Sequence, residues 1–553
     1  MRVPPGLAMS MFERSSVAAP TRSWRGMFLV MFVVALSLKI VIAATLSPFG
    51  DEAFYWQESL SPAWGYSDLP PLTAWLIALS EGIFGHGRLA IRLPFLLIGA
   101  ALPWQVGSIA KRLGGETARW QAATFALLLP LVGSLGVLAL PDVPLTFAIV
   151  LATQGLLAAL ETNRARDWCL LGVGLAIAWA SHYRAAMPML AGLLFLLATP
   201  RGRRQWRRPG LWLAMVVASL GLLPLVIYNV AARGAGVAFQ LVERNPWRFH
   251  ADALVQPLEQ AGACTPLAWA VLMWALWQAW RRRGEAPFDV VATVAGSFVV
   301  LYFVLGLFAD DVRFRAHWPL PGYVLLCAVL PSLLAHAGRA WRRVALAGFV
   351  LAGFGLLAGL GYLGLAASPD GARVLAGVKA FPSNFTGWRE SSASVRAQLA
   401  REPSALVVAD NFMLAAELRF ELGGSRVVYS LDSPLNAKHG RAPQLAAWGF
   451  DEAGLAKHAG QRVLLIVDET SLREREKRDW LASVCSRVDI AGPAARVDLF
   501  DGRRRFALYD ATVRAVRGAL GNPDDCVVWR EAYRASDIAA RSTSGQGDSG
   551  VSK

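Results

Sequence analysis

Two adjacent carboxylates, Asp51 and Glu52, follow directly after a long apolar run, in the segment Asp-Glu-Ala-Phe-Tyr-Trp. Acidic side chains at the edge of apolar segments are costly unless they are hydrated or used, which makes this pair a candidate for acid–base chemistry. Asp68 follows, just before a Pro-Pro pair, and Asp142 opens a later apolar run. A structural alternative remains for Asp51, whose side chain could cap a helix that begins near Ala53.

Basic side chains accompany the same segments. Arg184 interrupts an apolar hairpin, and Arg313, Arg315 and His317 come just before another apolar run. Lys39 lies inside the first run, where an isolated ammonium group is unfavourable. For each residue alone, an interaction with lipid headgroups is the commoner explanation. As a set on the side of the acidic residues, they favour an anionic substrate.

The elements that position these residues are predicted to be membrane helices. Hydrophobic residues make up 55% of the 553 residues and charged residues only 17%, and apolar runs of about 20 residues recur up to residue 367. The predicted fold class is therefore a polytopic α-helical membrane protein with about eleven transmembrane helices and a C-terminal α/β domain. The expected spans are residues 27–47, 89–110, 120–140, 143–161, 168–182, 184–199, 211–231, 261–280, 288–309, 316–337 and 344–367.

The orientation follows from the short loops between the runs. The first run is too long for a signal-peptide core, which predicts an uncleaved anchor with residues 1–26 in the cytoplasm. Residues 72–84 form one apolar helical face but are too short to span, so we expect a helix lying in the external interface. With that assignment every strongly basic short loop falls inside, and the loop 48–88 and the C-terminal domain fall outside.

The last third of the sequence differs in character. Between residues 368 and 535, β-rich runs alternate with helical ones, which predicts an α/β domain, and the Ser- and Gly-rich tail 536–553 is expected to be disordered. Strands are expected at residues 405–409, 426–431, 462–467, 487–491 and 506–509, and helices at 413–422 and 472–483. Cys485 and Cys526 could form a disulfide on the external side or be two unrelated thiols.

Several function classes lack support in the sequence. The net charge of +15 alone could indicate nucleic-acid binding, but the basic residues sit in short clusters between apolar runs, where membrane topology places them. We therefore expect no nucleic-acid partner. The sequence also has no phosphate-binding glycine loop, dinucleotide fingerprint or zinc-finger spacing.

The acidic motifs resemble a known family. Residues 39–100 are similar to the first external loop of the GT-C glycosyltransferases, particularly the bacterial branch resembling protein O-mannosyltransferases and the lipid A aminoarabinose transferase. A D-E-x-x-Y motif corresponds to Asp51, Glu52 and Tyr55, a D-x-P-P element begins at Asp68, and Asp142 matches a later acidic position. This sequence has Leu69 where many relatives have His, so any role of that His is absent.

The resemblance implies roles for these residues. Asp51 would be the catalytic base, and Glu52 or Asp142 would help to position the substrate or a divalent cation, although no cofactor is certain. Substrate contacts are then expected from the remaining candidates, which are Lys39, Tyr55, Asp68, Arg184, Arg313, Arg315 and His317.

The resemblance also implies an activity and a location. The chain would be an inverting glycosyltransferase of the bacterial inner membrane that takes a sugar from a polyprenyl-phosphate donor. The acceptor would be lipid A or lipopolysaccharide, another envelope glycan or a protein, on the periplasmic face. Two alternatives stay open. One is a transporter or lipid flippase, which inverted repeats would indicate. The other is an inactive family member that acts as an assembly partner.

Overall fold

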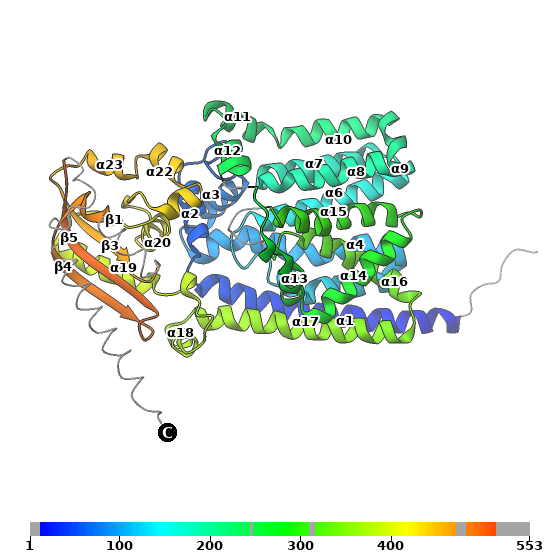
Figure 1. The fold of residues 1–553 in the computed structure, drawn as a ribbon. Coiled ribbons are helices and arrows are strands. Elements are labelled where there is room, and N and C mark those ends of the chain that lie inside the picture. Colours follow the sequence, from blue (N-terminus) through cyan, green and yellow to red (C-terminus); the bar gives the residue numbers. More distant parts are fainter. Residues whose placement is uncertain (1–10, 244–246, 309–315, 472–482, 516–553) are drawn as a thin grey trace, which may run out of the picture. The chain divides into compact units, whose positions relative to one another are not determined.

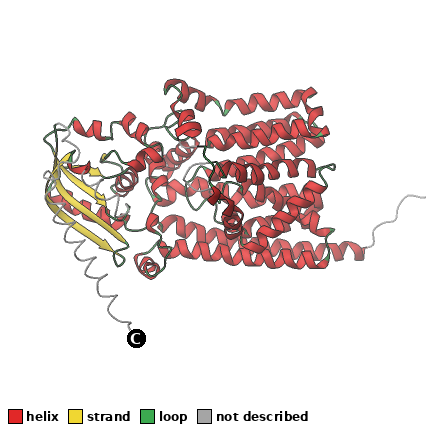
Figure 2. Ribbon diagram, in the orientation of Figure 1, coloured by secondary structure: helices red, strands yellow, loops and turns green. Residues whose placement is uncertain are grey.

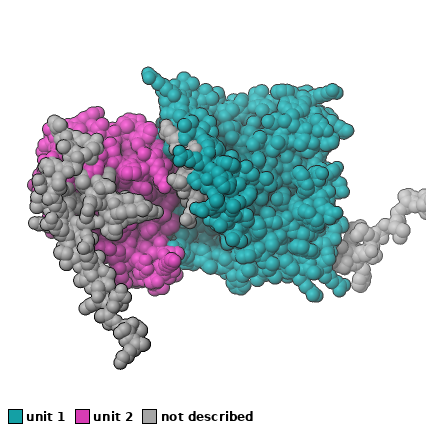
Figure 3. Space-filling view, viewed as in Figure 1, with its two compact units in different colours: residues 1–46, 58–364 teal, residues 47–57, 365–553 magenta. Residues whose placement is uncertain are grey.

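The computed structural model describes residues 11–243, 247–308, 316–471 and 483–515 (Figure 1). The chain divides into two compact units, which are coloured separately in Figure 3. Residues 1–46 and 58–364 form the membrane unit, and residues 47–57 and 365–553 form the C-terminal unit. The membrane unit is helical, and all the described strands belong to the C-terminal unit (Figure 2). Residues 47–57, expected in the external loop of the first domain, thus group with the C-terminal unit.

Helices of the membrane unit follow the apolar runs of the sequence. By length and composition, five described helices can each cross a membrane, and two bent helix pairs raise this number to seven. The chain is therefore a multi-pass helical membrane protein. Its helices, with α2 and α17 crossing the boundary between the units, are α1 (Met11–Thr45), α2 (Gly50–Ser59), α3 (Leu72–Phe84), α4 (Arg88–Leu128), α5 (Pro130–Gly133), α6 (Asp142–Thr162), α7 (Ala165–Ser181), α8 (Ala186–Ala198), α9 (Pro200–Arg203), α10 (Pro209–Leu220), α11 (Leu223–Ala231), α12 (Ala235–Ala238), α13 (Gln256–Cys264), α14 (Pro266–Arg281), α15 (Phe288–Gly306), α16 (Leu320–Ala335) and α17 (Arg339–Ala366).

Three of the expected spans are interrupted in the structure. The run 211–231 divides into α10 and α11, whose axes are bent by 44°. The run 120–140 was expected to be continuous, but α4 ends at Leu128, because Leu129 precedes Pro130 and is extended. The run 261–280 breaks at Thr265, which has φ +68° and precedes Pro266. Helix α4 itself is broken by non-helical backbone at Gly114 and Gly115, so it comprises two apolar segments.

A five-stranded mixed sheet forms the centre of the C-terminal unit, with strand order β2-β1-β3-β5-β4. The first three neighbours are parallel, and β5 pairs antiparallel with both β3 and β4. The expected strands are present, and the last two extend further than the sequence indicated. The bounds are β1 (Leu406–Ala409), β2 (Val428–Ser430), β3 (Arg462–Asp468), β4 (Val488–Leu499) and β5 (Arg504–Val513).

Both faces of the sheet are covered by apolar side chains. Val407 and Ala409 of β1 contribute to one core together with α19 and α20, while Val408 contributes to the opposite core. The helices of this unit are α18 (Pro369–Ala376), α19 (Trp388–Arg401), α20 (Phe412–Glu421), α21 (Pro434–Lys438), α22 (Ala442–Trp448) and α23 (Glu452–Ala456). The helix expected at residues 472–483 lies almost entirely outside the described residues.

The structure supports a disulfide at Cys485, one of the two cysteines expected to be able to pair. Cys485 is buried at the end of the sheet core and takes part in a disulfide, whereas Cys169, Cys264 and Cys327 are free. Cys526 lies outside the described residues, so its pairing with Cys485 stays a prediction.

Candidate functional site

The D-E-x-x-Y segment forms the first two turns of α2. This helix begins at Gly50, so Asp51 lies in its first turn rather than at a cap before Ala53. The neighbouring Glu52 performs the capping, because its Oε2 accepts a hydrogen bond of 3.0 Å from the backbone N–H of Phe49. Glu52 is fully buried. The two adjacent acids therefore have different surroundings, and Asp51 keeps a partly exposed carboxylate, at 23%.

Asp51 pairs with an arginine from the far end of the sequence. The Arg441 guanidinium donates a hydrogen bond of 3.1 Å from Nη2 to Oδ1 of Asp51. The ring nitrogen Nδ1 of His439 lies 4.0 Å from the same oxygen. Arg441 stands immediately before α22, and both partners come from the short connection between α21 and α22. The C-terminal unit thus supplies the groups that orient the candidate base.

The arginine is held in an aromatic setting. Its guanidinium carbon lies 4.3 Å from the ring centre of Phe54, 5.0 Å from that of Tyr55 and 5.6 Å from that of Phe412. Only 2% of the Arg441 side chain is exposed. A buried guanidinium needs a charged or hydrogen-bonding partner, and Asp51 is one that the fold provides. The spacing of the motif has a local explanation: Asp51 binds the guanidinium of Arg441, and Tyr55, one turn later, packs on it.

The membrane unit contains a second acid–base group. Asp142 begins α6, and its Oδ1 accepts a hydrogen bond from Nη2 of Arg184 and lies 3.3 Å from Nε2 of His317. Arg184 lies in the short 3₁₀ turn η1 (Tyr183–Ala185) between α7 and α8, where its backbone N–H donates to the His182 ring. Its guanidinium also lies 5.7 Å from the ring centre of Trp318. The structure therefore brings three of the predicted site residues together.

Other predicted residues have identifiable surroundings. Lys39 is 4% exposed, and its ammonium donates a hydrogen bond of 2.6 Å to the carbonyl oxygen of Leu135, in the segment that leads to α6. Asp68 is buried in the loop before α3, and its carbonyl oxygen accepts a bond of 2.7 Å from Gln240. Arg313 and Arg315 lie outside the described residues. Their roles, like those of the whole set, stay predictions.

Three residues that organise these groups were missed from the sequence. Arg441 and His439 belong to a basic run, Lys-His-Gly-Arg, in the predicted external domain, and that run was the available signal. Arg92 is fully buried in α4 and donates bonds of 3.0 and 2.8 Å to the carbonyl oxygens of Ala43 and Leu46. It thereby satisfies the carbonyl end of α1. An arginine within an otherwise apolar run was its signal.

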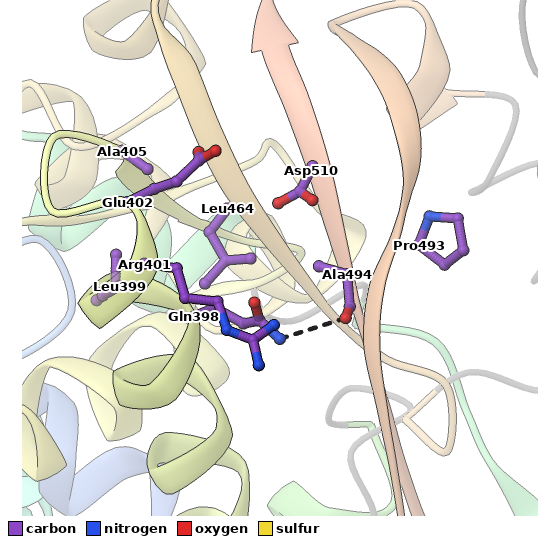
Figure 4. A pocket seen from close by; sticks show the side chains of 9 residues that line it. All are labelled: Gln398, Leu399, Arg401, Glu402, Ala405, Leu464, Pro493, Ala494 and Asp510. Atoms are coloured by element: carbon purple, nitrogen blue, oxygen red, sulfur yellow. Dashed lines mark hydrogen bonds between the residues drawn. The ribbon is translucent and has the colours of Figure 1, made fainter.

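A cavity elsewhere contains none of the predicted residues. Figure 4 shows it in the C-terminal unit, between the end of α19 and the strands β3, β4 and β5, with a volume of about 200 Å³. Gln398 crosses it and donates a bond of 3.2 Å to the carbonyl oxygen of Ala494. Among the described residues, no group of three or more His, Cys, Asp or Glu side chains could hold a metal ion. The two arginine–aspartate groups are therefore the main candidates for chemistry.

Comparison with known proteins shows similarity to membrane glycosyltransferases. Residues 68–228 match the family described as dolichyl-phosphate-mannose-protein mannosyltransferase. The chain is 27% identical over 282 residues to the lipid A galacturonosyltransferase RgtD of Rhizobium johnstonii, covering 50% of this chain and 58% of that protein. It is 29% identical over 334 residues to the undecaprenyl phosphate-alpha-4-amino-4-deoxy-L-arabinose arabinosyl transferase of Pseudomonas aeruginosa, covering 54% and 56%. The matches thus span less than two thirds of these curated relatives.

The fold is shared over a greater length. The crystal structure of ArnT from Cupriavidus metallidurans bound to undecaprenyl phosphate superposes with a TM-score of 0.62, covering 89% of this chain and 99% of that one, at 18% sequence identity. The apo form of the same protein gives a TM-score of 0.61. The resemblance expected from the Asp51 and Asp68 motifs is thereby confirmed. The chain is therefore similar to the GT-C glycosyltransferases: to the dolichyl-phosphate-mannose-protein mannosyltransferases over residues 68–228, and to an arabinosyl transferase and a lipid A galacturonosyltransferase over about half of its length. It shares the fold of ArnT.

Proposed function

We propose that this protein transfers a sugar from a polyprenyl-phosphate donor to a lipid A acceptor, with Asp51 as the catalytic base. The observation that carries the proposal is the pairing of Asp51 with the buried Arg441, which leaves a partly exposed carboxylate in a fixed orientation. A base that is already oriented needs no rearrangement when the acceptor arrives. The names of the relatives supply the substrates: lipid A for the galacturonosyltransferase, and undecaprenyl phosphate for the arabinosyl transferase.

We infer eleven membrane passes from the described helices. Helix α4 supplies two of them, on either side of Gly114 and Gly115. The pairs α10–α11 and α13–α14 would each be one interrupted pass, and α7, α8 and α16 would be short passes of 17, 13 and 16 residues. Such interruptions are tolerated where neighbouring helices cover the backbone. An odd number of passes puts residues 1–26 and the C-terminal unit on opposite sides, and the basic loops favour a cytoplasmic N-terminus and a periplasmic C-terminal unit in the inner membrane.

The proposed reaction is one inverting displacement. The acceptor oxygen attacks the anomeric carbon of the sugar, the bond from that carbon to the phosphate oxygen breaks, and polyprenyl phosphate leaves. Where the acceptor is a hydroxyl, Asp51 takes its proton; where it is a phosphate, Asp51 orients it instead. The contacts of Asp51 with Arg441 and His439 both involve Oδ1. The other oxygen, Oδ2, is therefore the one assigned to the acceptor.

In this account the second group serves the departing phosphate. Arg184 and His317 provide nitrogen donors, and Asp142 holds both in place through a single oxygen. Cationic donors fixed before the reaction stabilise charge as it develops on the leaving group. Lys39 and Asp68 are proposed to shape the donor site, with Lys39 fixing the segment before α6 through Leu135. Tyr55 is proposed to hold Arg441 beside Asp51. Glu52 is assigned a structural role, because its carboxylate caps α2.

The experiment uses the full-length protein in lipid nanodiscs with purified lipid A. A panel of undecaprenyl-phosphate sugars, including aminoarabinose and galacturonic acid, is offered one at a time, and both products are followed by mass spectrometry. The proposal predicts lipid A heavier by one sugar residue and an equal amount of free undecaprenyl phosphate. Movement of the donor between leaflets with no sugar transferred would support a flippase instead. Binding without turnover of any donor would support an inactive assembly partner.

A further inference from the structure

The membrane unit contains an apolar cavity that has no role in the proposed sugar transfer. This cavity of about 340 Å³ lies among α6, α7, α8 and α10. Its size falls within the range of about 300–1,000 Å³ that small-ligand pockets occupy. Thr153 is a rare polar residue in its lining, and the Thr153 hydroxyl is already used in a 2.9 Å bond to the Ile149 carbonyl oxygen. The lining therefore suits a hydrocarbon chain.

The cavity lies toward the end of the helices that is remote from Asp142. Asp142 begins α6, whereas Thr153 and Leu156 lie further along the same helix, about 16–21 Å away at roughly 1.5 Å per residue. In Figure 1, α9 and α3 likewise lie at opposite ends of the helix bundle of this unit. Leu193 and Met215, which line the cavity, are 43% and 39% exposed. The cavity therefore opens sideways, where lipid chains surround a membrane helix.

A basic turn stands at the mouth of this cavity. After α8 the chain bends by 92° into α9 and the 3₁₀ turn η2 (Arg204–Arg207), so this segment runs across the helix direction. Trp206 of η2 lines the cavity, and its carbonyl oxygen accepts a 3.1 Å bond from the indole of Trp212, another lining residue. Tryptophans in such a place are typical of the membrane–water interface. One short segment thus supplies both a cavity wall and a set of cations.

The charges of this turn are mostly available. Arg201 pairs with Asp289 at 3.4 Å, and Arg203 donates to the last carbonyl oxygens of α8. Arg204, Arg207 and Arg208 are exposed and, within the described part of the chain, pair with no carboxylate. Guanidinium groups bind phosphate oxygens through two parallel hydrogen bonds. The turn therefore complements an anionic headgroup.

We propose that these elements form a binding site for an anionic phospholipid of the leaflet at this end of the bundle. One acyl chain would occupy the cavity, and the headgroup phosphate would lie on Arg204, Arg207 and Arg208. Moving an acyl chain from the bilayer into the cavity releases little free energy, because the surrounding lipid chains are equally apolar. The cavity therefore only positions the chain, and the arginines provide the selectivity for an anionic headgroup. The site is independent of sugar transfer and would bind lipid in an inactive variant as well.

Gly192 offers a direct way to fill the cavity. It lines the cavity, and a Cβ built on it meets no atom within 4 Å. Gly192→Leu should therefore place a side chain in the cavity without disturbing the packing of α8. Gly361→Leu is the matched control, because Gly361 also lies in an apolar helix, α17, and also has open space around it.

The test is native mass spectrometry of the full-length protein titrated with phosphatidylglycerol or phosphatidylcholine. We expect phosphatidylglycerol to bind about tenfold more tightly. The triple variant Arg204→Gln, Arg207→Gln, Arg208→Gln should abolish that preference, and Gly192→Leu should weaken binding of both lipids, whereas Gly361→Leu should change neither. Equal binding of the two lipids, or unchanged binding by Gly192→Leu, would overturn the proposal. Displacement of phosphatidylglycerol by undecaprenyl phosphate would instead assign the cavity to the donor, and loss of a dimer in Gly192→Leu would assign it to a second copy.

Discussion

Asp51 and Asp142 each lie in the first turn of a helix and each pair with an arginine, but the two pairs are built differently. The partner of Asp142, Arg184, is 42 residues away and comes from the turn between α7 and α8. The partner of Asp51, Arg441, is 390 residues away and is enclosed by aromatic rings of the C-terminal unit. The Asp142 pair thus lies within the membrane unit, whereas the orientation of the candidate base Asp51 depends on the fold of the C-terminal unit.

The largest effect that separates the two pairs should come from Asp51→Asn. Loss of the carboxylate removes the proton acceptor, and we expect turnover to fall about 10³-fold, as for other general bases. Release of undecaprenyl phosphate per enzyme molecule measures this. Asp370→Asn is the control, since Asp370 is an exposed acid of the same unit, at 91%. If the turnover of Asp51→Asn stayed within about twofold of wild type, Asp51 would not be the catalytic base.

Arg441→Gln should produce the next largest effect. The change leaves Asp51 present but unoriented, so we expect kcat to fall by up to about 10²-fold with little change in the KM for the donor. Arg441→Lys, which keeps the charge but loses the planar guanidinium, should recover only part of the rate. Arg373→Gln, on the exposed surface of the same unit, controls for loss of a positive charge. If kcat stayed unchanged in Arg441→Gln while the protein remained folded, Arg441 would not position the base.

Arg184→Gln and His317→Gln should show the opposite pattern. Because both residues are assigned to the donor phosphate, we expect the KM for the donor to rise roughly tenfold or more, and kcat to fall as well if the contact strengthens during departure. Arg166→Gln is the matched control, since Arg166 is 71% exposed in the first turn of α7. If only the KM for lipid A rose, Arg184 and His317 would bind the acceptor and not the donor phosphate.

The smallest effect concerns a third carboxylate group, which is structural. Asp410 and Asp468 end adjacent parallel strands, both are buried, and Arg504 donates a 2.8 Å bond to Asp468. Burial, followed by the nearby Asp468 charge, raises the pKa of Asp410 well above its usual range. A carboxyl whose folded-state pKa is raised lowers stability above that pKa, and this penalty disappears as the pH falls toward the unfolded pKa near about 4.

Asp410→Asn should therefore stabilise the C-terminal unit at pH 8 by on the order of 1 kcal/mol, and the gain should shrink as the pH falls to about 5. Hydrogen-exchange protection of β1 and β3 reports the stability of this unit directly. Asp370→Asn should give no such pH-dependent difference. Destabilisation by Asp410→Asn that grows at high pH would show that the ionised carboxylate is favoured in the folded protein.

The sequence predicted most of the helices and all five strands because both follow from hydrophobic periodicity. The apolar helix over residues 72–84 was predicted with its observed bounds. Two of the three interrupted spans break before prolines: Pro130 and Pro266 end helices through the residue before them, which the hydropathy of a run does not register. The third, over residues 211–231, bends between α10 and α11.

The candidate site was predictable only where membrane topology places the residues on one side of the bilayer. Asp142, Arg184 and His317 could be placed together because loops on one side of a membrane share a compartment, and the structure brings them into contact. Arg441 could not be assigned to Asp51, because no periodicity or spacing links residues so far apart. Its burial depends on Phe54 and Phe412, from two distant segments that pack together only in the folded unit.

Mass spectrometry of lipid A from cells that lack the chain, and from the same cells carrying wild-type or Asp51→Asn protein, tests the central claim most directly. We expect lipid A to lose one sugar residue without the chain, to regain it with the wild-type protein and not to regain it with Asp51→Asn at equal membrane abundance. Lipid A of identical mass in all three strains, or restoration by Asp51→Asn, would contradict it.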